Sequence, residues 1–399
     1  MKTKNTLISI VHACLAGTTA GVLAEELPDL TPATDKKAKK DSGNCCEALK
    51  DLGEIYDNKK NPWIQKLEFS GRIHQQWGYT DGSDNGRDFS NDGYDLRRLR
   101  LGFDLNFLHD FTLESSVNFE RGGFRDSSIG FDGFDQLHLT YDFGDLGAFK
   151  KVEAGYGRYK LGFGGEETTS SNEIKTIERS LLNNEFAGDR TTGARVSFEV
   201  GDNIDFILGV YTTDADAETF GNWNGGTLYH VGSDFDALGG HLDLQAYYSD
   251  ASETENEVLD YRWAVSATHE TEIGSIDLFT NATYGEDYNG DAVYGVVIMH
   301  STELIEDKLE AVLRYQWAYS EEGDLRPQKR NVGAVATDDF GFGMELPKGR
   351  RNHNIYAGLN YFLCDHNAKA MFGVEYESNS GAGADTEATT VWGALRFSF

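Results

Sequence analysis

Cationic side chains alternate with apolar side chains in several parts of this sequence. Arg98 and Arg100 flank Leu99, for example. Successive side chains of a β-strand point to opposite faces, so this spacing predicts strands with one charged and one apolar face. Because an unpaired charge in hydrocarbon is costly, the charged faces should line a watery interior. The cationic residues predicted to line it are Arg72, His74, Arg98, Arg100, Lys151, Arg195, Arg262, Arg314 and Arg396.

These side chains form no pattern that we recognise as catalytic or metal-binding. The His and Cys residues lack the spacing of metal ligands, and no Ser, His and acidic residues share one face in a catalytic arrangement. We therefore expect no enzyme activity, no cofactor and no bound metal of structural importance. Acidic stretches such as residues 81–95 are predicted to be solvated external loops, in which divalent cations bind weakly and bridge to surface lipid.

The composition excludes some classes of protein and favours another. The chain has 66 acidic and 36 basic residues and a formal net charge of −30, so we do not expect it to bind nucleic acid. No segment after the N-terminal one approaches the ~18 uninterrupted apolar residues that a membrane helix needs. A transmembrane β-barrel has no such run, because only every second residue faces lipid. The 19 Tyr, 24 Phe and only 5 Pro suit a barrel.

The period-two pattern recurs from about residue 64 to the end of the sequence. It predicts an all-β fold, a transmembrane antiparallel β-barrel of roughly sixteen strands in the outer membrane of a bacterium with two membranes. Short turns such as residues 108–110 alternate with long connections such as residues 321–353, which is expected when the short turns face the periplasm. A soluble β-sandwich is the alternative, but its strands would be shorter.

The sequence divides into three parts. Basic residues followed by an apolar run predict a signal peptide over residues 1–24, and therefore export. Residues 25–62 are predicted to be a periplasmic linker with a short helix, because apolar residues between Ala48 and Ile55 have helical spacing. A disordered tether is the alternative for this part. Residues 63–399 are predicted to form the barrel.

Cys45, Cys46 and Cys364 follow the predicted signal peptide. An exported protein reaches an oxidising compartment, where cysteines form disulfides. Cys364 lies in a predicted periplasmic turn, and the adjacent pair precedes the first strand on the same side. We therefore predict that one cysteine of the pair bridges to Cys364 or to a neighbouring subunit.

The segment Gly155–Asn183 differs from the other connections. After several glycines it becomes polar, with Ile174, Ile177 and Leu181 at helical spacing. A long loop with an apolar face of its own should pack on something, and a wide barrel offers its interior. This segment resembles the signature of the phosphate-selective porin O/P family. The residues that fall in the family's order are Gly157, Lys160, Phe163, Glu166, Ser170, Ser171, Ile174, Ile177, Glu178, Arg179 and Ser180.

The resemblance implies a sixteen-stranded porin, commonly trimeric, whose third external loop folds inward and narrows the pore. The residues that it implies at or near this constriction are Lys160, Glu166, Glu178 and Arg179. The sequence departs from the family at Gly162, where proline is usual, and at Gly165, where leucine is usual. The loop should therefore enter the barrel with a different bend.

We expect a passive, water-filled channel for small hydrophilic solutes or ions, including anions such as phosphate. Oxyanion binding needs converging Arg and Lys side chains, yet the clearest basic clusters, near Arg326 and Arg350, lie in a predicted external loop. The alternative is a structural or adhesive outer-membrane barrel whose lumen is plugged by the loop after the fifth strand.

The sequence ends in an alternating segment in which Leu395, Phe397 and Phe399 are predicted to face lipid and Arg396 the lumen. A terminal Phe399 resembles the signal by which outer-membrane barrels are handed to their assembly machinery. The expected partners are that machinery, outer-membrane lipid and lipopolysaccharide, small hydrophilic solutes, and the other subunits of a homotrimer.

Overall fold

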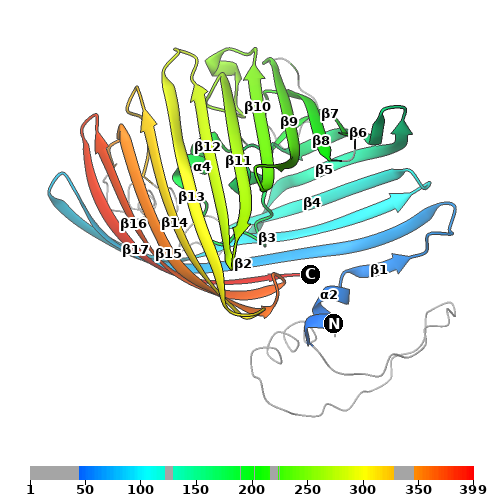
Figure 1. Ribbon diagram of the computed structural model, residues 1–399, viewed down its shortest axis with the longest axis horizontal. Coiled ribbons are helices and arrows are strands. Elements are labelled where there is room, and N and C mark those ends of the chain that lie inside the picture. Colours follow the sequence, from blue (N-terminus) through cyan, green and yellow to red (C-terminus); the bar gives the residue numbers. More distant parts are fainter. Residues whose placement is uncertain are drawn as a thin grey trace, which may run out of the picture.

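The strands of this protein form one antiparallel sheet that closes into a barrel (Figure 1). The computed structural model describes residues 45–121, 129–188, 190–201, 203–215, 223, 225–327 and 346–399. The sheet has 17 strands, and because β1 pairs only with the start of β2, the other sixteen form the wall. These are β2 (Ile64–Asp84), β3 (Arg87–Phe107), β4 (Phe111–Arg121), β5 (Ile129–Leu146), β6 (Phe149–Lys160), β7 (Arg190–Val200), β8 (Ile204–Thr212), β9 (Thr227–Ala237), β10 (Gly240–Ser249), β11 (Trp263–Ile273), β12 (Ile276–Glu286), β13 (Ala292–Ile305), β14 (Leu309–Ser320), β15 (Arg351–Cys364), β16 (Ala368–Gly381) and β17 (Ala384–Ser398).

Each strand of the wall pairs with its neighbours in the sequence, and the last strand pairs with the first. Arg396 of β17 lies opposite His74 of β2, and Trp392 lies opposite Gly78. Closure leaves no open sheet edge, so backbone amides and carbonyls bond to one another within the wall, as a hydrocarbon environment requires. The predicted all-β barrel of about sixteen strands is confirmed.

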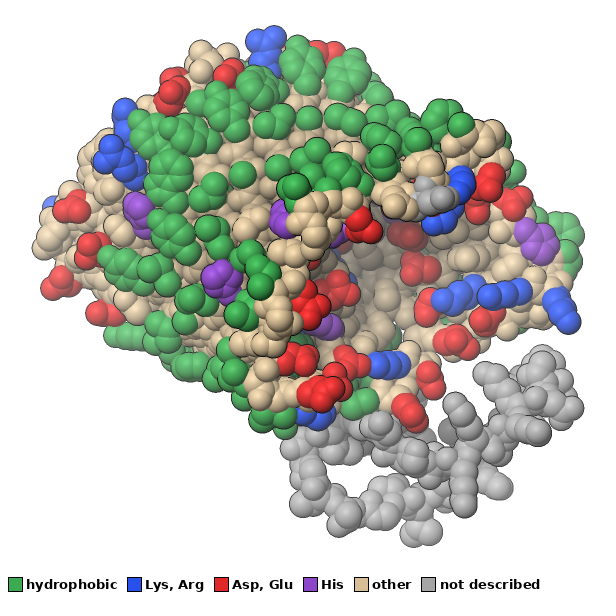
Figure 2. All heavy atoms as spheres, in the orientation of Figure 1, with side chains coloured by type: hydrophobic (Ala, Val, Ile, Leu, Met, Phe, Trp, Pro, Cys, Tyr) green, Lys and Arg blue, Asp and Glu red, His purple; other side chains and the backbone are tan. Residues whose placement is uncertain are grey.

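Side chains alternate between the inside and the outside of the wall. On β14, Arg314 and Gln316 are fully buried inside the barrel, whereas Leu313 and Tyr315 are exposed on its outer face. Figure 2 shows hydrophobic side chains over much of the outer surface and acidic and basic side chains around the hollow. This is the arrangement that the period-two pattern predicts.

The acidic stretch 81–95 is not an external loop, and that prediction was wrong. Strand β2 continues to Asp84 and β3 begins at Arg87, with only Asn85 and Gly86 between them. These two residues have φ angles of 47° and 77°, the conformation that an Asn-Gly pair adopts in a two-residue hairpin. The carboxylates of this stretch are therefore spread along two paired strands and do not gather in one loop.

The N-terminal part is a short helix followed by a short strand. Helix α2 (Cys45–Asp51) confirms a helix here, but it ends earlier than the apolar spacing predicted, because β1 (Glu54–Asp57) pairs with β2. Ile55 therefore lies in a strand. No described helix is long and apolar enough to cross a membrane. The predicted signal peptide and the linker as far as residue 44 lie outside the described residues.

A disulfide joins α2 to the turn between β15 and β16. Cys46 bonds to Cys364 across a sequence separation of 318 residues. Beside it, Lys50 Nζ lies 2.6 Å from Asp365 Oδ2, and this ion pair holds the pKa of the Asp365 carboxyl below its usual range. The predicted bridge between one cysteine of the pair and Cys364 is therefore confirmed within the chain.

The C-terminal residue packs on the first strand of the wall. Phe399 and Gly71 exchange two backbone hydrogen bonds, each 3.1 Å long. The ring of Phe399 lies so close to Gly71 that any side chain at position 71 would collide with it. Leu395 is exposed and Arg396 is buried inside the barrel, as the alternation predicted, but Phe399 lines a cavity of the lumen instead of facing lipid, because β17 ends at Ser398.

We expect thiol labelling to detect the Cys46–Cys364 bridge. Denatured, unreduced protein should leave both cysteines unmodified by iodoacetamide, because only free thiols react. Reduction before labelling should expose both, and peptide mass mapping reads out each site. The Cys364→Ser variant is the control, since it should leave Cys46 open to labelling. Labelling of either residue in the unreduced wild-type protein would contradict the bridge.

Candidate functional site

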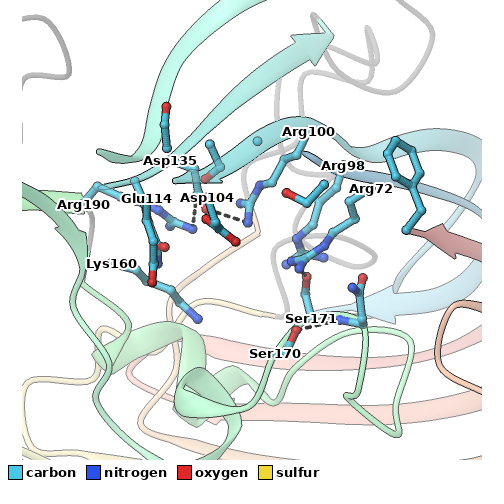
Figure 3. Close-up of a pocket in the computed structure, with 18 of the residues that line it drawn as sticks. Arg72, Arg98, Arg100, Asp104, Glu114, Asp135, Lys160, Ser170, Ser171 and Arg190 are labelled. Atoms are coloured by element: carbon cyan, nitrogen blue, oxygen red, sulfur yellow. Dashed lines mark hydrogen bonds and ion pairs between the residues drawn. The ribbon is translucent and has the colours of Figure 1, made fainter. Parts of the chain in front are cut away.

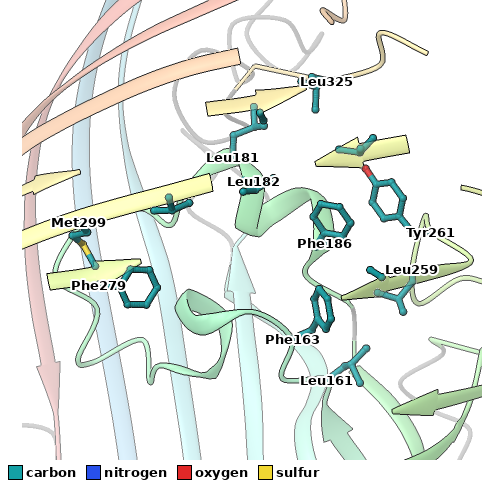
Figure 4. Close-up of a cluster of buried hydrophobic side chains, with 14 of the residues drawn as sticks. Leu161, Phe163, Leu181, Leu182, Phe186, Leu259, Tyr261, Phe279, Met299 and Leu325 are labelled. Atoms are coloured by element: carbon teal, nitrogen blue, oxygen red, sulfur yellow. The ribbon is translucent and has the colours of Figure 1, made fainter. Parts of the chain in front are cut away.

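The connection between β6 and β7 folds back into the barrel. It contains two short helices, α3 (Gly165–Thr168) and α4 (Leu181–Phe186). Its apolar side chains Phe163, Ile177 and Leu182 are at most 1% exposed and belong to a cluster that includes residues of the wall (Figure 4). Burying a large apolar side chain contributes about 1.5–3 kcal/mol. This apolar core therefore holds the loop inside, as predicted for the segment after the fifth strand of the barrel.

Arg314 ties the loop to the wall. Its side chain is fully buried on β14, with Nη1 3.0 Å from Oε1 of Glu166 in α3 and Nη2 3.1 Å from Oε1 of Glu375 in β16. Trp392 Nε1 donates to the other oxygen of Glu375 at 3.1 Å. One guanidinium thus bridges two buried carboxylates, one from the loop and one from the wall.

Further cations hold the tip of the loop through its backbone carbonyls. Arg396 donates to the carbonyl of Ser171 at 3.1 Å, and Lys369 donates to the carbonyl of Ile174 at 3.0 Å. Hydrogen bonds from charged donors are among the stronger ones in proteins. The position of the loop is therefore fixed by charged groups of the wall as well as by its apolar core.

Several residues predicted to line the pore are covered by this loop. His74, Arg314 and Arg396 face inward from the wall, as the alternation predicts, but each is at most 2% exposed because the loop packs on it. Glu166, Glu178 and Arg179, which the family resemblance implies near the constriction, belong to the loop itself and are at most 6% exposed because they pack against the wall.

We expect Arg314→Met to loosen the loop. The substitution leaves Glu166 and Glu375 as buried carboxylates without their guanidinium, a change that typically costs about 3–5 kcal/mol. Thermal unfolding of the purified protein should begin at a lower temperature, and single-channel currents should become noisier. Arg351→Met, which removes an exposed arginine of β15, is the matched control. Unchanged unfolding and unchanged noise in Arg314→Met would contradict this role.

A β-bulge brings an additional arginine into the lumen. On β3, Leu96 and Arg97 together lie opposite the single residue Gln75 of β2. This extra residue lets Arg97 and Arg98, adjacent in the sequence, both face inward. Arg97 Nε lies 2.9 Å from Glu178 Oε1 in the loop, whereas Arg98 lines an open cavity.

That cavity, of about 360 Å³, lies between the loop and the wall formed by β2, β3 and their neighbours. Figure 3 shows Arg72 and Arg98 converging beside Ser171 of the loop, and Arg72 donates to Ser171 Oγ at 2.6 Å. Within the described part of the chain, Arg98 forms no ion pair or hydrogen bond. The charged residues that line the cavity are Arg72, Arg98, Arg100, Asp104, Glu114, Asp135, Lys160, Arg179 and Arg190.

Other cations of this cavity have carboxylate partners. Arg100 Nη1 lies 2.7 Å from Asp135 Oδ2, and Arg190 Nη2 lies 2.5 Å from Asp135 Oδ1. Lys160 Nζ lies 2.7 Å from Glu167 Oε1. The positive charge without a carboxylate partner in the described chain therefore lies with Arg72 and Arg98.

Two other arginines predicted to line the pore, Arg195 and Arg262, do not line this cavity. Arg195 faces inward, with its guanidinium carbon 4.4 Å from the centre of the Tyr159 ring. Arg262 does not face the lumen as predicted: it is exposed and lies over Tyr248, an exposed residue of the outer face, at 5.9 Å. The reason is that Arg262 precedes β11, which begins at Trp263, so the alternation of the strand does not include it.

Acidic side chains line another part of the lumen. A cavity of about 280 Å³ on the other side of α3 is lined by Asp205, Asp234, Asp243 and His241, among others. His241 Nε2 lies 2.7 Å from an oxygen of Asp234. Because Thr168 lines both this cavity and the basic one, the two cavities meet at α3. The lumen is thus basic on one side of the helix and acidic on the other.

A group of carboxylates also gathers outside the lumen. Oxygens of Asp287, Asp291 and Glu322, from the connections after β12 and β14, lie within 4.8 Å of one another. All three side chains are at least partly exposed. Among the described residues, this is the group with the spacing of a cation site.

Sequence reasoning missed Arg97, Asp135, Glu167 and Lys369. Arg97 and Asp135 both lie at register shifts, where the alternation of the strand moves by one residue. Glu167 lies in α3, to which strand alternation does not apply. Lys369 does follow the alternation of β16, two residues from the buried Met371, so the sequence contained the signal that would have found it.

The sequence of the barrel matches a known family. The family model described as phosphate-selective porin O and P matches residues 67–303, more than half of the chain. The chain belongs to this family. No curated protein matches it in sequence.

Solved porin structures share the fold. The anion-selective porin from Comamonas acidovorans has a TM-score of 0.56 at 13% identity, covering 84% of this chain and 99% of that one. Pseudomonas putida OprB has a TM-score of 0.55 at 14% identity, covering 90% and 96%. The outer membrane channel DcaP of Acinetobacter baumannii has a TM-score of 0.54 at 14% identity, covering 86% and 100%. At these identities the likeness concerns the fold.

Family and fold agree on location and general activity. A closed barrel with an apolar outer face and a polar, charged lumen suits the outer membrane. The protein is an outer-membrane porin, a channel for small hydrophilic solutes.

Proposed function

We propose that this porin is a passive channel that favours anions, and that an oxyanion such as phosphate binds between Arg72 and Arg98 as it passes. The proposal rests on one observation: the guanidinium of Arg98 lines the cavity and forms no ion pair with a described carboxylate. A cation partly withdrawn from water is stabilised by a counter-ion. An oxyanion there would accept hydrogen bonds from both guanidinium groups and from Ser171 Oγ.

The strongly negative formal charge of the chain does not oppose this proposal. Exposed charges farther apart than about 10 Å are largely screened at physiological salt, so the groups that line the narrow part dominate the energy of a passing ion. The description of the family also favours phosphate.

Other parts of the proposal rest on the family resemblance. We infer a homotrimer, because members of the family are commonly trimeric. Outer-membrane lipid, lipopolysaccharide and the barrel assembly machinery are the inferred partners. The porin has no catalytic cycle, since transport down a gradient needs none.

We expect the Arg72→Met/Arg98→Met double variant to lose anion preference. Removing one charge about 4 Å from a permeating ion changes the energy of that ion by about 1 kcal/mol, so removing both should lower the chloride-to-potassium permeability ratio by roughly thirtyfold. Reversal potentials in a KCl gradient across a planar bilayer measure this ratio. Phosphate should reduce the wild-type current and have less effect on the variant. Arg262→Met is the matched control, because it removes an arginine from the outer face.

Two outcomes would contradict the anion proposal. An equal change in Arg262→Met would mean that the cavity is not responsible, and an absence of phosphate block in the wild-type channel would remove phosphate from the proposal. The alternative of a structural or adhesive barrel with a plugged lumen predicts no stable open steps at all.

We expect deletion of Phe399 to lower insertion into the outer membrane while leaving export intact. The deletion removes both the terminal aromatic group and its two hydrogen bonds to Gly71. Cell fractionation measures inserted and periplasmic protein separately. Phe399→Tyr, which keeps an aromatic end, is the control and should insert as the wild type does. Normal insertion of the deletion variant would show that Phe399 is not an assembly signal.

A further inference from the structure

A cavity of about 320 Å³ lies between the loop that connects β6 to β7 and the wall of β11, β12 and β13. It is separate from the basic cavity, and neither Arg72 nor Arg98 lines it. Its volume lies in the range of pockets that bind small organic molecules.

The floor of this cavity is apolar. Phe279 on β12 lies directly opposite Met299 on β13, and each side chain is 8% exposed. Figure 4 shows the two side chains next to each other beside the loop. Ile174, a buried residue of the loop, adds an aliphatic group. A ring and a thioether side by side form a flat surface that suits an aromatic or aliphatic body.

The rim of the cavity carries negative charge. Glu270 lies directly opposite Phe279 on the neighbouring strand β11, and both side chains line the cavity. Glu173 faces the cavity from the loop. Both are exposed, and within the described part of the chain neither side chain forms an ion pair or hydrogen bond.

The other charged groups around the cavity are engaged in ion pairs. Lys175 Nζ lies 2.8 Å from Asp277 Oδ2 and 3.2 Å from Glu310 Oε1. Glu166 pairs with Arg314, as described above. The carboxylates that line this cavity without an ion pair among the described residues are therefore Glu270 and Glu173, and Glu173 also lies within range of the charges of Arg72 and Lys369.

We propose that this cavity binds amphipathic organic cations, in which a protonated amine is attached to an aromatic or aliphatic body. The ammonium group donates hydrogen bonds to Glu270 and Glu173, and its charge is also attracted to the face of the Phe279 ring. The body of the ligand covers Phe279 and Met299 and excludes water from them. The two cavities share no charged side chain, so variants in one of them test that site separately from the other.

Calorimetric titration of the purified full chain with phenethylammonium chloride tests the proposal. We expect saturable binding to the wild type, weakened about tenfold or more by Glu270→Gln and by Phe279→Leu, since each removes one of the two features that recognise the ligand. Neutral phenethyl alcohol should bind more weakly than the amine. Arg98→Met should bind the amine as the wild type does, which separates this site from the anion site.

Asp243→Asn is the matched control, because it removes a lumen carboxylate that does not line this cavity. Equal weakening by Asp243→Asn and Glu270→Gln would mean that cations are attracted by the acidic lumen as a whole, and would overturn the site. Absence of saturable binding to the wild type would overturn it as well. A thermal unfolding temperature of Glu270→Gln equal to that of the wild type verifies that this variant is folded.

Discussion

The buried guanidinium of Arg314 sets the layout of the lumen. It lies between Glu166 of the loop and Glu375 of the wall, and neither carboxylate is exposed enough for water to replace it. The apolar core around Phe163 and Ile177 supplies favourable free energy for keeping the loop inside, but apolar contacts tolerate sliding. Buried ion pairs tolerate sliding of the loop far less, because any displacement of one partner leaves the other charge unpaired. The position of α3, and with it the shape of each cavity, depends on this contact together with the bonds that Arg396 and Lys369 donate to the loop.

The loop divides the lumen by charge. On one side of α3 the wall presents Arg72 and Arg98, and on the other side it presents Asp205, Asp234 and Asp243. The wall alone would give a wide polar cylinder with mixed charges. The folded loop converts it into separate spaces with opposite chemical preferences. The connection between β6 and β7 therefore determines where the lumen attracts anions and where it attracts cations.

Much of the fold could be predicted from the sequence, because alternation reports the environment of each side chain directly. Leu313, Arg314 and Tyr315 alternate in the sequence as they do in the wall. The errors arose where backbone geometry departs from a regular strand. Asn85-Gly86 was a hairpin signal that the surrounding acidic residues obscured, and the bulge beside Arg97 leaves no mark in the residue pattern. The sequence also indicated an inward loop, but not that this loop would cover Arg314 and Arg396, since covering depends on how two distant segments pack.

The bond between Cys46 and Cys364 has a consequence for the order of assembly. It turns residues 46–364 into a covalent ring that contains β1 to β15 and leaves β16 and β17 as a free tail. The barrel closes only when this tail meets β2, which belongs to the ring. A disulfide that forms before closure holds the beginning of the chain near the end of β15, so the hairpin of β16 and β17 starts close to β2. The disulfide therefore shortens the distance over which the last two strands of the barrel must pair.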